Sequence, residues 1–144
     1  MIRIEPLDPK HIDMIEKTDM DSLLAVSIEE RAYRRYATNG PAVTIFDDDV
    51  ILALGGVVKF WNGVGEAWTM ISPAGRRKKK YVFKYMLYFL NQCLSVEGFH
   101  RIQAKAIFGN KKSHGFIMKL GFIPEGTLIN YGPNKENFIS YVRF

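Results

Sequence analysis

The sequence predicts one α+β domain, with a mostly antiparallel sheet of six to seven strands flanked by about four helices. Its 144 residues, 47% of them hydrophobic, suffice for a single core without disulfides or metals. Apolar residues alternate in some short segments, as in strands, and recur every three or four positions in others, as in helices. No internal repeat or low-complexity segment divides residues 1–144. We therefore expect all the elements to share one core.

The first half of the chain has helical patterns near its start and extended patterns after them. Leu24, Ile28 and Ala32 recur every four residues behind the capping pair Asp21–Ser22, which indicates a helix. Trp61–Gly63 is a hairpin signal, so the flanking strands form an antiparallel meander. The predicted elements are, in order, a strand at 2–7, a helix at 9–18, a helix from 21 to 36, and strands at 42–46, 50–60 and up to 71.

The second half is dominated by one long helical pattern. Val82, Met86, Phe89 and Cys93 recur at spacings of three and four, which predicts a core helix with Cys93 buried in it. Cys93 is the only cysteine, so the chain forms no internal disulfide. The predicted elements are, in order, a helix at 78–97 ended by Gly98, a strand at 99–106, a helix capped by Asn110 and ended by Gly121, and strands at 122–129 and 137–144.

The chain is basic, with a formal net charge of +5 and a pI near 9.3. This charge favours contact with an anion such as phosphate, nucleic acid or an acidic protein. The cations gather at Arg31, Arg34 and Arg35, in the run Arg76–Lys80, and at Lys111–Lys112. No Cys, His or carboxylate spacing indicates a metal site. The chain shows neither a secretion signal nor a run of about 18 apolar residues, so we expect it in a reducing cytoplasm and away from membranes.

The segment Asn110–Phe122 carries the most specific pattern in the sequence, and Glu125–Gly126 follows it closely. Its physical interpretation is a helix capped by Asn110 and ended by Gly121, whose left-handed backbone releases the chain into a strand. The segment resembles the Asn-x-x-(Ala/Ser) helix, the Lys-Leu-Gly-Phe ending and the Glu-Gly of the GNAT (GCN5-related N-acetyltransferase) superfamily. The order of strands and helices resembles that family throughout the chain, which implies the GNAT fold.

A second match lies at Ile71–Arg76, which resembles the strand end, proline and arginine that begin the acetyl-CoA pyrophosphate loop of the same family. Backbone N–H groups and a helix N-terminus hold the phosphates there, because both stabilise an anion. Five cations at a helix N-terminus repel one another and oppose the helix dipole unless an anion binds. The residues that the resemblance assigns to acetyl-CoA are Met70, Ile71, Ser72, Arg76, Arg77, Lys78, Lys79, Lys80, Tyr81, Asn110 and Ser113.

Three positions depart from the family pattern. Lys79 and Tyr81 stand where the family's loop has glycines that let the backbone approach a phosphate closely. Ile117 stands where the family often has a tyrosine that acts as general acid, and isoleucine transfers no proton. Small GNAT-like proteins of tailed phages have a similar basic, glycine-poor loop, and Gly109–His114 resembles their Gly-Asn-x-x-Ser-His. That resemblance implies an infected bacterium as the setting and host-protein modification as a role.

The resemblance implies transfer of an acetyl group from acetyl-CoA to an amine, which attacks the thioester directly. The backbone of residues 70–72 is the candidate for orienting the acetyl group. Glu66 is the candidate base, or else an ordinary surface carboxylate. His114 is a candidate acid or base, or else a helix-start residue bonded to backbone. Further candidate proton donors are the tyrosines Tyr81, Tyr85 and Tyr131, which packing alone also explains.

Three functions fit these observations. The first is an N-acetyltransferase acting on a host protein or a small amine. The second is a catalytically silent GNAT fold that binds a host or virion protein through its basic surface. The third is nucleic-acid binding through the arginines at 31–35 and the run at 76–80, although no helix-turn-helix or RNA-binding signature accompanies these charges. The sequence indicates neither the oligomeric state nor the acceptor.

Overall fold

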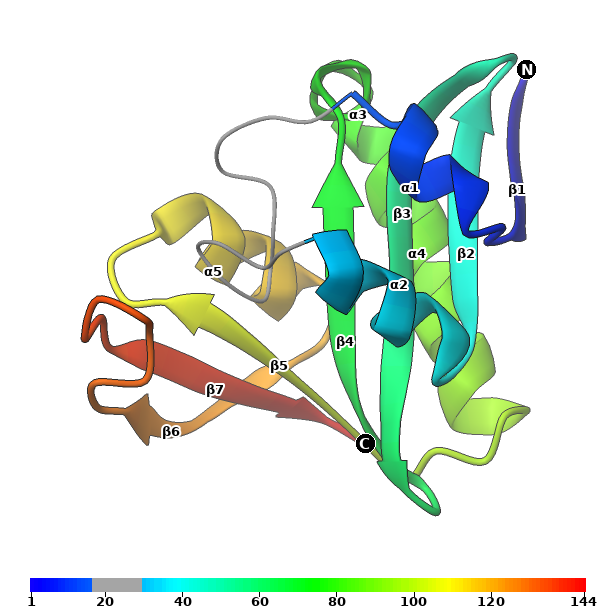
Figure 1. Ribbon diagram of the computed structural model, residues 1–144. Coiled ribbons are helices and arrows are strands. Elements are labelled where there is room, and N and C mark those ends of the chain that lie inside the picture. Colours follow the sequence, from blue (N-terminus) through cyan, green and yellow to red (C-terminus); the bar gives the residue numbers. More distant parts are fainter. Residues whose placement is uncertain (17–29) are drawn as a thin grey trace.

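A computed structural model describes residues 1–16 and 30–144. Within them, seven strands form one sheet of order β1-β2-β3-β4-β5-β7-β6 (Figure 1). The strands are β1 (Ile2–Pro6), β2 (Ala42–Asp47), β3 (Val50–Trp61), β4 (Val64–Ile71), β5 (Arg101–Ile107), β6 (Ile123–Leu128) and β7 (Phe138–Arg143). Every neighbouring pair is antiparallel except β4 with β5. The α+β class and the strand count predicted from the sequence are confirmed.

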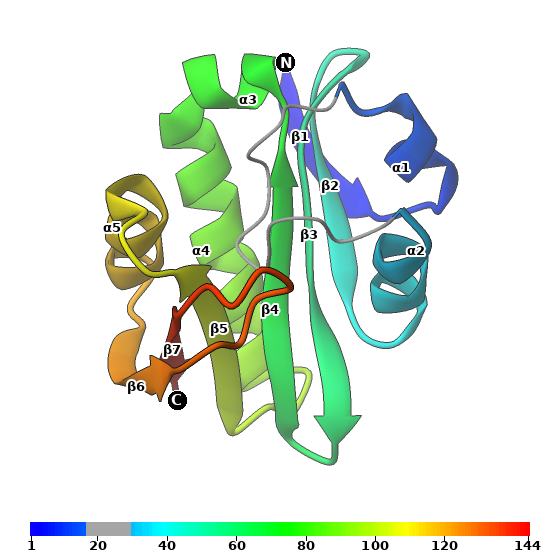
Figure 2. The same cartoon turned by 60° about the vertical axis from the view of Figure 1, so that its left-hand side comes forward.

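Helices cover both faces of the sheet. They are α1 (Lys10–Met14), α2 (Glu30–Thr38), α3 (Pro73–Arg77), α4 (Lys79–Ser95) and α5 (Lys111–Lys119). Helices α1 and α2 lie on one face, whereas α4 and α5 lie on the other (Figure 2). The helix predicted at 9–18 ends already at Met14, and the predicted cap at Asp21–Ser22 lies outside the described residues. None of the described helices is long and apolar enough to cross a membrane.

Two apolar clusters hold the layers together. On one face, Met86 and Cys93 of α4 and Ile117 of α5 pack against β3 and β5. On the other face, Ile12 of α1 packs with Trp68 of β4. Central strand β3 has seven consecutive buried residues, as expected of a strand covered on both faces. Strands β1 to β5 and β7 contribute to these clusters, so the core fixes the positions of the side chains that these strands carry.

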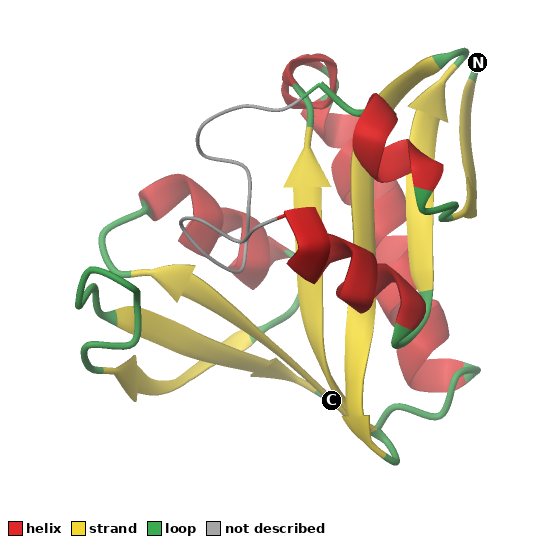
Figure 3. Ribbon diagram, viewed as in Figure 1, coloured by secondary structure: helices red, strands yellow, loops and turns green. Residues whose placement is uncertain are grey.

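Strands β4 and β5 run parallel and then separate. They pair only at Val64–Arg101, Gly65–Ile102 and Glu66–Gln103. Figures 1 and 3 show the two strands starting side by side and diverging toward their carboxyl ends. Beyond Glu66, no described strand pairs with β4 on its β5 side, and we call this unpaired edge of residues 67–71 the open edge of β4.

Helix α5 has the ends that the sequence predicts. The Asn110 side chain accepts a hydrogen bond from the backbone N–H of Ser113 at 3.3 Å, which caps the helix. Gly121 has a φ of +94° and begins the turn into β6. Between these ends, Leu120 is 2% exposed and belongs to the same cluster as Ile117.

Replacement of Leu120 with alanine is therefore expected to destabilise the fold by about 2 to 5 kcal/mol, because a cavity forms in the core. Met118→Ala on the same helix is the matched control, since Met118 is 54% exposed. Chemical denaturation measures both free energies of unfolding. Equal, small effects of the two substitutions would contradict the packing of α5.

Candidate functional site

The site begins at a rigid connection between β4 and α4. Ser72 Oγ accepts a hydrogen bond from the backbone N–H of Gly75 at 3.1 Å and donates one to the Ile51 carbonyl at 2.7 Å. A side chain at Gly75 would have its Cβ 2.0 Å from the carbonyl oxygen of Leu52, so only glycine fits there. Strand β4 ends just before residues 73–75, which begin the one-turn helix α3, because proline suits a first helical turn.

This connection presents the N-terminus of α4 to solvent. Among the described residues, no backbone acceptor receives the N–H groups of Lys79 and Lys80, the first two residues of α4. Unpaired N–H groups and the positive end of a 17-residue helix together favour a bound anion.

A groove of about 720 Å³ lies between this helix start and α5. We call it the basic groove; its lining residues are Ile71, Gly75, Arg76, Lys79, Lys80, Val82, Phe83, Lys111, Lys112, Gly115, Phe116 and Lys119. Six of the twelve are cationic and none is acidic. The cations come from two segments far apart in sequence, so their repulsion is concentrated at one place. A polyanion such as a phosphorylated ligand would relieve that repulsion.

The other residues predicted for the cofactor do not line the groove. Lys78 is bonded to Asp47, and the hydrogen bond and charge of that carboxylate raise the pKa of the Lys78 ammonium. Arg77 and Tyr81 are exposed and do not line the groove. The remaining predicted residues serve structural contacts: Met70 is buried on the α1 and α2 face, Ser72 caps α3, and Asn110 caps α5 over Ser113.

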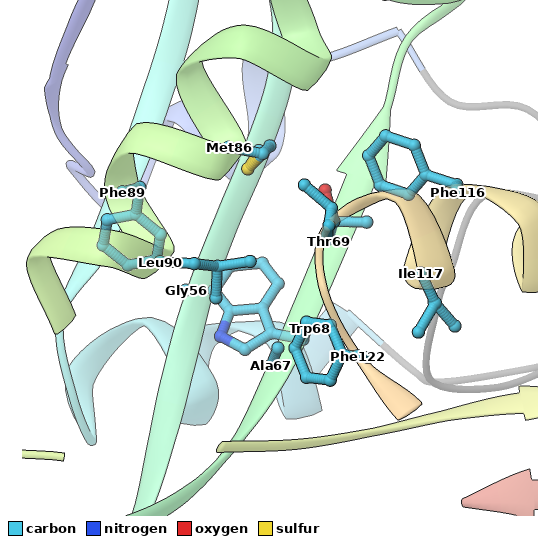
Figure 4. Close-up of a pocket in the computed structure, with 11 residues that line it drawn as sticks. Gly56, Ala67, Trp68, Thr69, Met86, Phe89, Leu90, Phe116, Ile117 and Phe122 are labelled. Carbon is cyan, nitrogen blue, oxygen red and sulfur yellow. The ribbon is translucent and has the colours of Figure 1, made fainter. Parts of the chain in front are cut away.

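A small apolar pocket lies beneath β4 on the α4 and α5 face (Figure 4). Thr69 of β4, Met86 of α4 and Phe116 of α5 line it together with Ile117. Ile117, at the family's tyrosine position, is completely buried. No other group lining this pocket takes over a tyrosine's proton transfer, because Thr69 already donates its hydroxyl to the Leu54 carbonyl at 2.8 Å.

Polar side chains gather on the opposite face, where β4 and β5 separate. Lys105 Nζ lies 2.6 Å from Glu66 Oε1, and the two side chains are only 14% and 11% exposed. Gln103 donates to the same carboxylate oxygen at 3.3 Å, and Lys105 also donates to the Tyr131 hydroxyl at 3.1 Å. We call Glu66, Gln103, Lys105 and Tyr131 the polar cluster.

The charges of the polar cluster influence their surroundings. Burial opposes the Lys105 ammonium, but the hydrogen bond and charge of Glu66 outweigh it and raise the pKa of Lys105. Burial, and then the charge of Glu66, raises the pKa of the Tyr36 hydroxyl on α2. Tyr36 therefore borders the cluster. Among the described residues, no three His, Cys, Asp or Glu side chains gather as a metal site requires.

His114 connects α5 to the sheet. Its Nε2 lies 3.0 Å from the Ile107 carbonyl oxygen, which only accepts hydrogen bonds, so Nε2 carries the proton. Its Nδ1 then accepts from the Tyr141 hydroxyl, a group whose pKa burial raises. Both ring nitrogens are thus engaged between β5 and β7, and this arrangement favours the structural interpretation of His114.

The three candidate tyrosines are widely separated. Tyr85 donates to the Ile2 carbonyl at 3.4 Å, near the far edge of the sheet. Tyr81 lies on the exposed side of α4. Only Tyr131 adjoins Glu66, through Lys105.

Lys105 and Gln103 were not identified from the sequence. They alternate with the buried residues Ile102, Ala104 and Ala106, so the pattern of β5 puts them on one face. That they meet Glu66 depends on a parallel pairing between strands 37 residues apart, which no local pattern indicates.

No protein-family model and no curated protein sequence matches the chain. Solved structures do. The spermidine N-acetyltransferase SpeG of Vibrio cholerae is 13% identical over 99% of this chain and 92% of that chain, with a TM-score of 0.76. The ribosomal-protein-S5-alanine acetyltransferase of Vibrio fischeri is 14% identical over the same shares, with a TM-score of 0.75.

The N-acetyltransferase of Staphylococcus aureus Mu50 is 12% identical over 99% of this chain and 96% of that chain, with a TM-score of 0.74. The chain has the GNAT fold. The likeness covers 99% of the chain, so the helices and strands that carry the basic groove and the polar cluster lie within it. At identities this low the likeness concerns the fold alone.

Proposed function

We propose that the chain is an N-acetyltransferase that transfers an acetyl group from acetyl-CoA to an amine. The observation that carries this proposal is the basic groove, which joins an open helix N-terminus to the unpaired edge of β4 within a GNAT fold. A ligand with phosphates at one end and a thioester at the other matches that arrangement of charge and open backbone.

The cofactor's phosphates would bind at the N–H groups of Lys79 and Lys80 and among the groove's cations. Lys79 and Tyr81, which stand at the family's glycine positions, do not obstruct this binding. Tyr81 does not line the groove, and Lys79 lines it with a flexible side chain whose charge favours a phosphate. The missing glycines therefore leave the groove open. The pantetheine arm carries amides and would add to the open edge of β4 as an extended strand does.

In the reaction, the acceptor nitrogen attacks the thioester carbonyl, the C–S bond breaks, and the amide and CoA thiolate form. Glu66 is the base for the amine proton, because its carboxylate lies at the last β4–β5 pair, beside the open edge. Tyr131 is the tyrosine that adjoins Glu66 and is our candidate to return a proton to the thiolate. Main-chain groups of residues 70–72 would orient the acetyl carbonyl.

The proposed acceptor is an amine on a host protein, and the proposed setting is the cytoplasm of a phage-infected bacterium. Support comes from the resemblance of Gly109–His114 to small phage GNAT-like proteins. The basic surface also favours acidic protein partners.

A second candidate function is a catalytically silent GNAT fold that binds a host or virion protein. Three observations support it. Isoleucine stands at position 117 in place of a tyrosine, both ring nitrogens of His114 are hydrogen-bonded, and Glu66 is paired with Lys105. For a silent binder, a pull-down from host extract would recover one stoichiometric partner, and no host protein would be acetylated.

CoA is expected to bind with salt-sensitive affinity and to raise the melting temperature, because its phosphates relieve repulsion in the basic groove. The double variant Lys111→Ala, Lys112→Ala should weaken binding by roughly tenfold, measured by isothermal titration calorimetry. Lys10→Ala with Lys59→Ala is the control of equal charge change outside the groove. No binding at millimolar CoA, or equal losses in both double variants, would contradict the proposed cofactor site.

Glu66→Gln is expected to keep CoA binding but lower turnover by ~10²-fold or more, the usual scale for a positioned base. The deficit should shrink at high pH, where the amine loses its proton unaided. Glu97→Gln, an exposed carboxylate elsewhere, is the control for turnover measured by thiol release. Unchanged turnover in Glu66→Gln would leave positioning of the thioester as the main contribution to catalysis.

A further inference from the structure

The polar cluster already contains an alkylammonium group, that of Lys105. Its Nζ lies 2.6 Å from Glu66 Oε1 and 4.9 Å from the centre of the Tyr131 ring. A carboxylate and an aromatic face are the groups that proteins use to bind ammonium ligands. The site that an acceptor amine would need is thus occupied by a side chain of the protein itself.

Lys105 reaches this position because of how β5 leaves β4. It lies two residues beyond the last paired residue, Gln103, where the strands have begun to separate. It also projects from the face of β5 opposite to Ala104 and Ala106, which are buried in the α4 and α5 cluster. The side chain therefore crosses the opening from β5 toward Glu66 on β4.

The ion pair removes the negative charge that a polycation would need. Glu66 and Lys105 together carry no net charge, and Arg35 adds positive charge near Tyr36. The basic groove contributes six more cations at the other end of the open β4 edge. A trication such as spermidine, the substrate in the name of one similar structure, would meet no net negative charge in the polar cluster and six cations in the basic groove.

We propose that Lys105 is a specificity-determining residue: its ammonium occupies Glu66, so the site rejects polyamines and takes a single amine carried on a neutral or acidic protein surface. This inference rests on the proposed function, because it assigns Glu66 to the acceptor side of that site. An acceptor with one amine takes the place of the Lys105 ammonium as the single cation paired with Glu66. A polyamine brings two further charges that no described carboxylate of the cluster neutralises.

The test compares spermidine binding to the wild-type chain, Lys105→Met and Lys105→Arg by isothermal titration calorimetry, with and without CoA. Lys105→Met should bind spermidine about tenfold or more tightly than wild type, because Glu66 becomes available. Lys105→Arg should bind spermidine as weakly as wild type does, since it retains a cation beside Glu66. Adding Glu66→Gln to Lys105→Met should abolish the gain. The affinity for butylamine, which carries a single amine on a similar alkyl chain, should differ far less between wild type and Lys105→Met.

Melting temperatures check that each variant folds, and Lys105→Gln replaces Lys105→Met if the methionine variant does not. Equal spermidine affinity in wild type and the neutral variants would overturn the proposal, as would a gain that persists with Glu66→Gln. In acetyl-transfer assays, a fall in KM for spermidine confined to the neutral variants supports it. If no variant transfers acetyl groups, the proposed function fails, whereas the calorimetric comparison still decides the role of Lys105.

Discussion

The limited pairing of β4 with β5 is the constraint on which the rest of the site depends. The two strands share three residue pairs and then separate, while β3 pairs with β4 along its length and β7 pairs with β5. Each half of the sheet is therefore held by its own antiparallel partner, and the opening between them needs no support from a ligand. If the pairing continued, the open edge of β4 and the place of Lys105 would both be lost.

Charge is distributed unevenly along this opening. At its wide end, cations of α3, α4 and α5 meet around two open N–H groups, an arrangement suited to phosphates. Where the strands part, one carboxylate is balanced by one ammonium in a partly buried cluster. The first place favours a strongly anionic ligand, whereas the second has no net charge. Under the proposed function, the two ends would discriminate between the cofactor and the acceptor by electrostatics.

Local patterns in the sequence predicted the strands, the α5 cap at Asn110 and the turn at Gly121, because each depends on neighbouring residues. They did not predict α3, where Ser72 and Gly75 act through contacts with Ile51 and Leu52. Tertiary packing brings Lys111 and Lys112 beside the basic run at 76–80. It also pairs Lys105 with Glu66. Local sequence patterns therefore sufficed to predict the class of fold. The positions of single functional groups depend on tertiary packing, which such patterns do not encode.

The central claim is that the basic groove and the open edge of β4 form one cofactor site. Amide chemical-shift mapping by nuclear magnetic resonance during a CoA titration tests it most directly. The account predicts that the largest shifts occur at Lys79 and Lys80 and continue along residues 67–71. Shifts confined to other surfaces, such as the β3–β4 hairpin around Asn62, would contradict it.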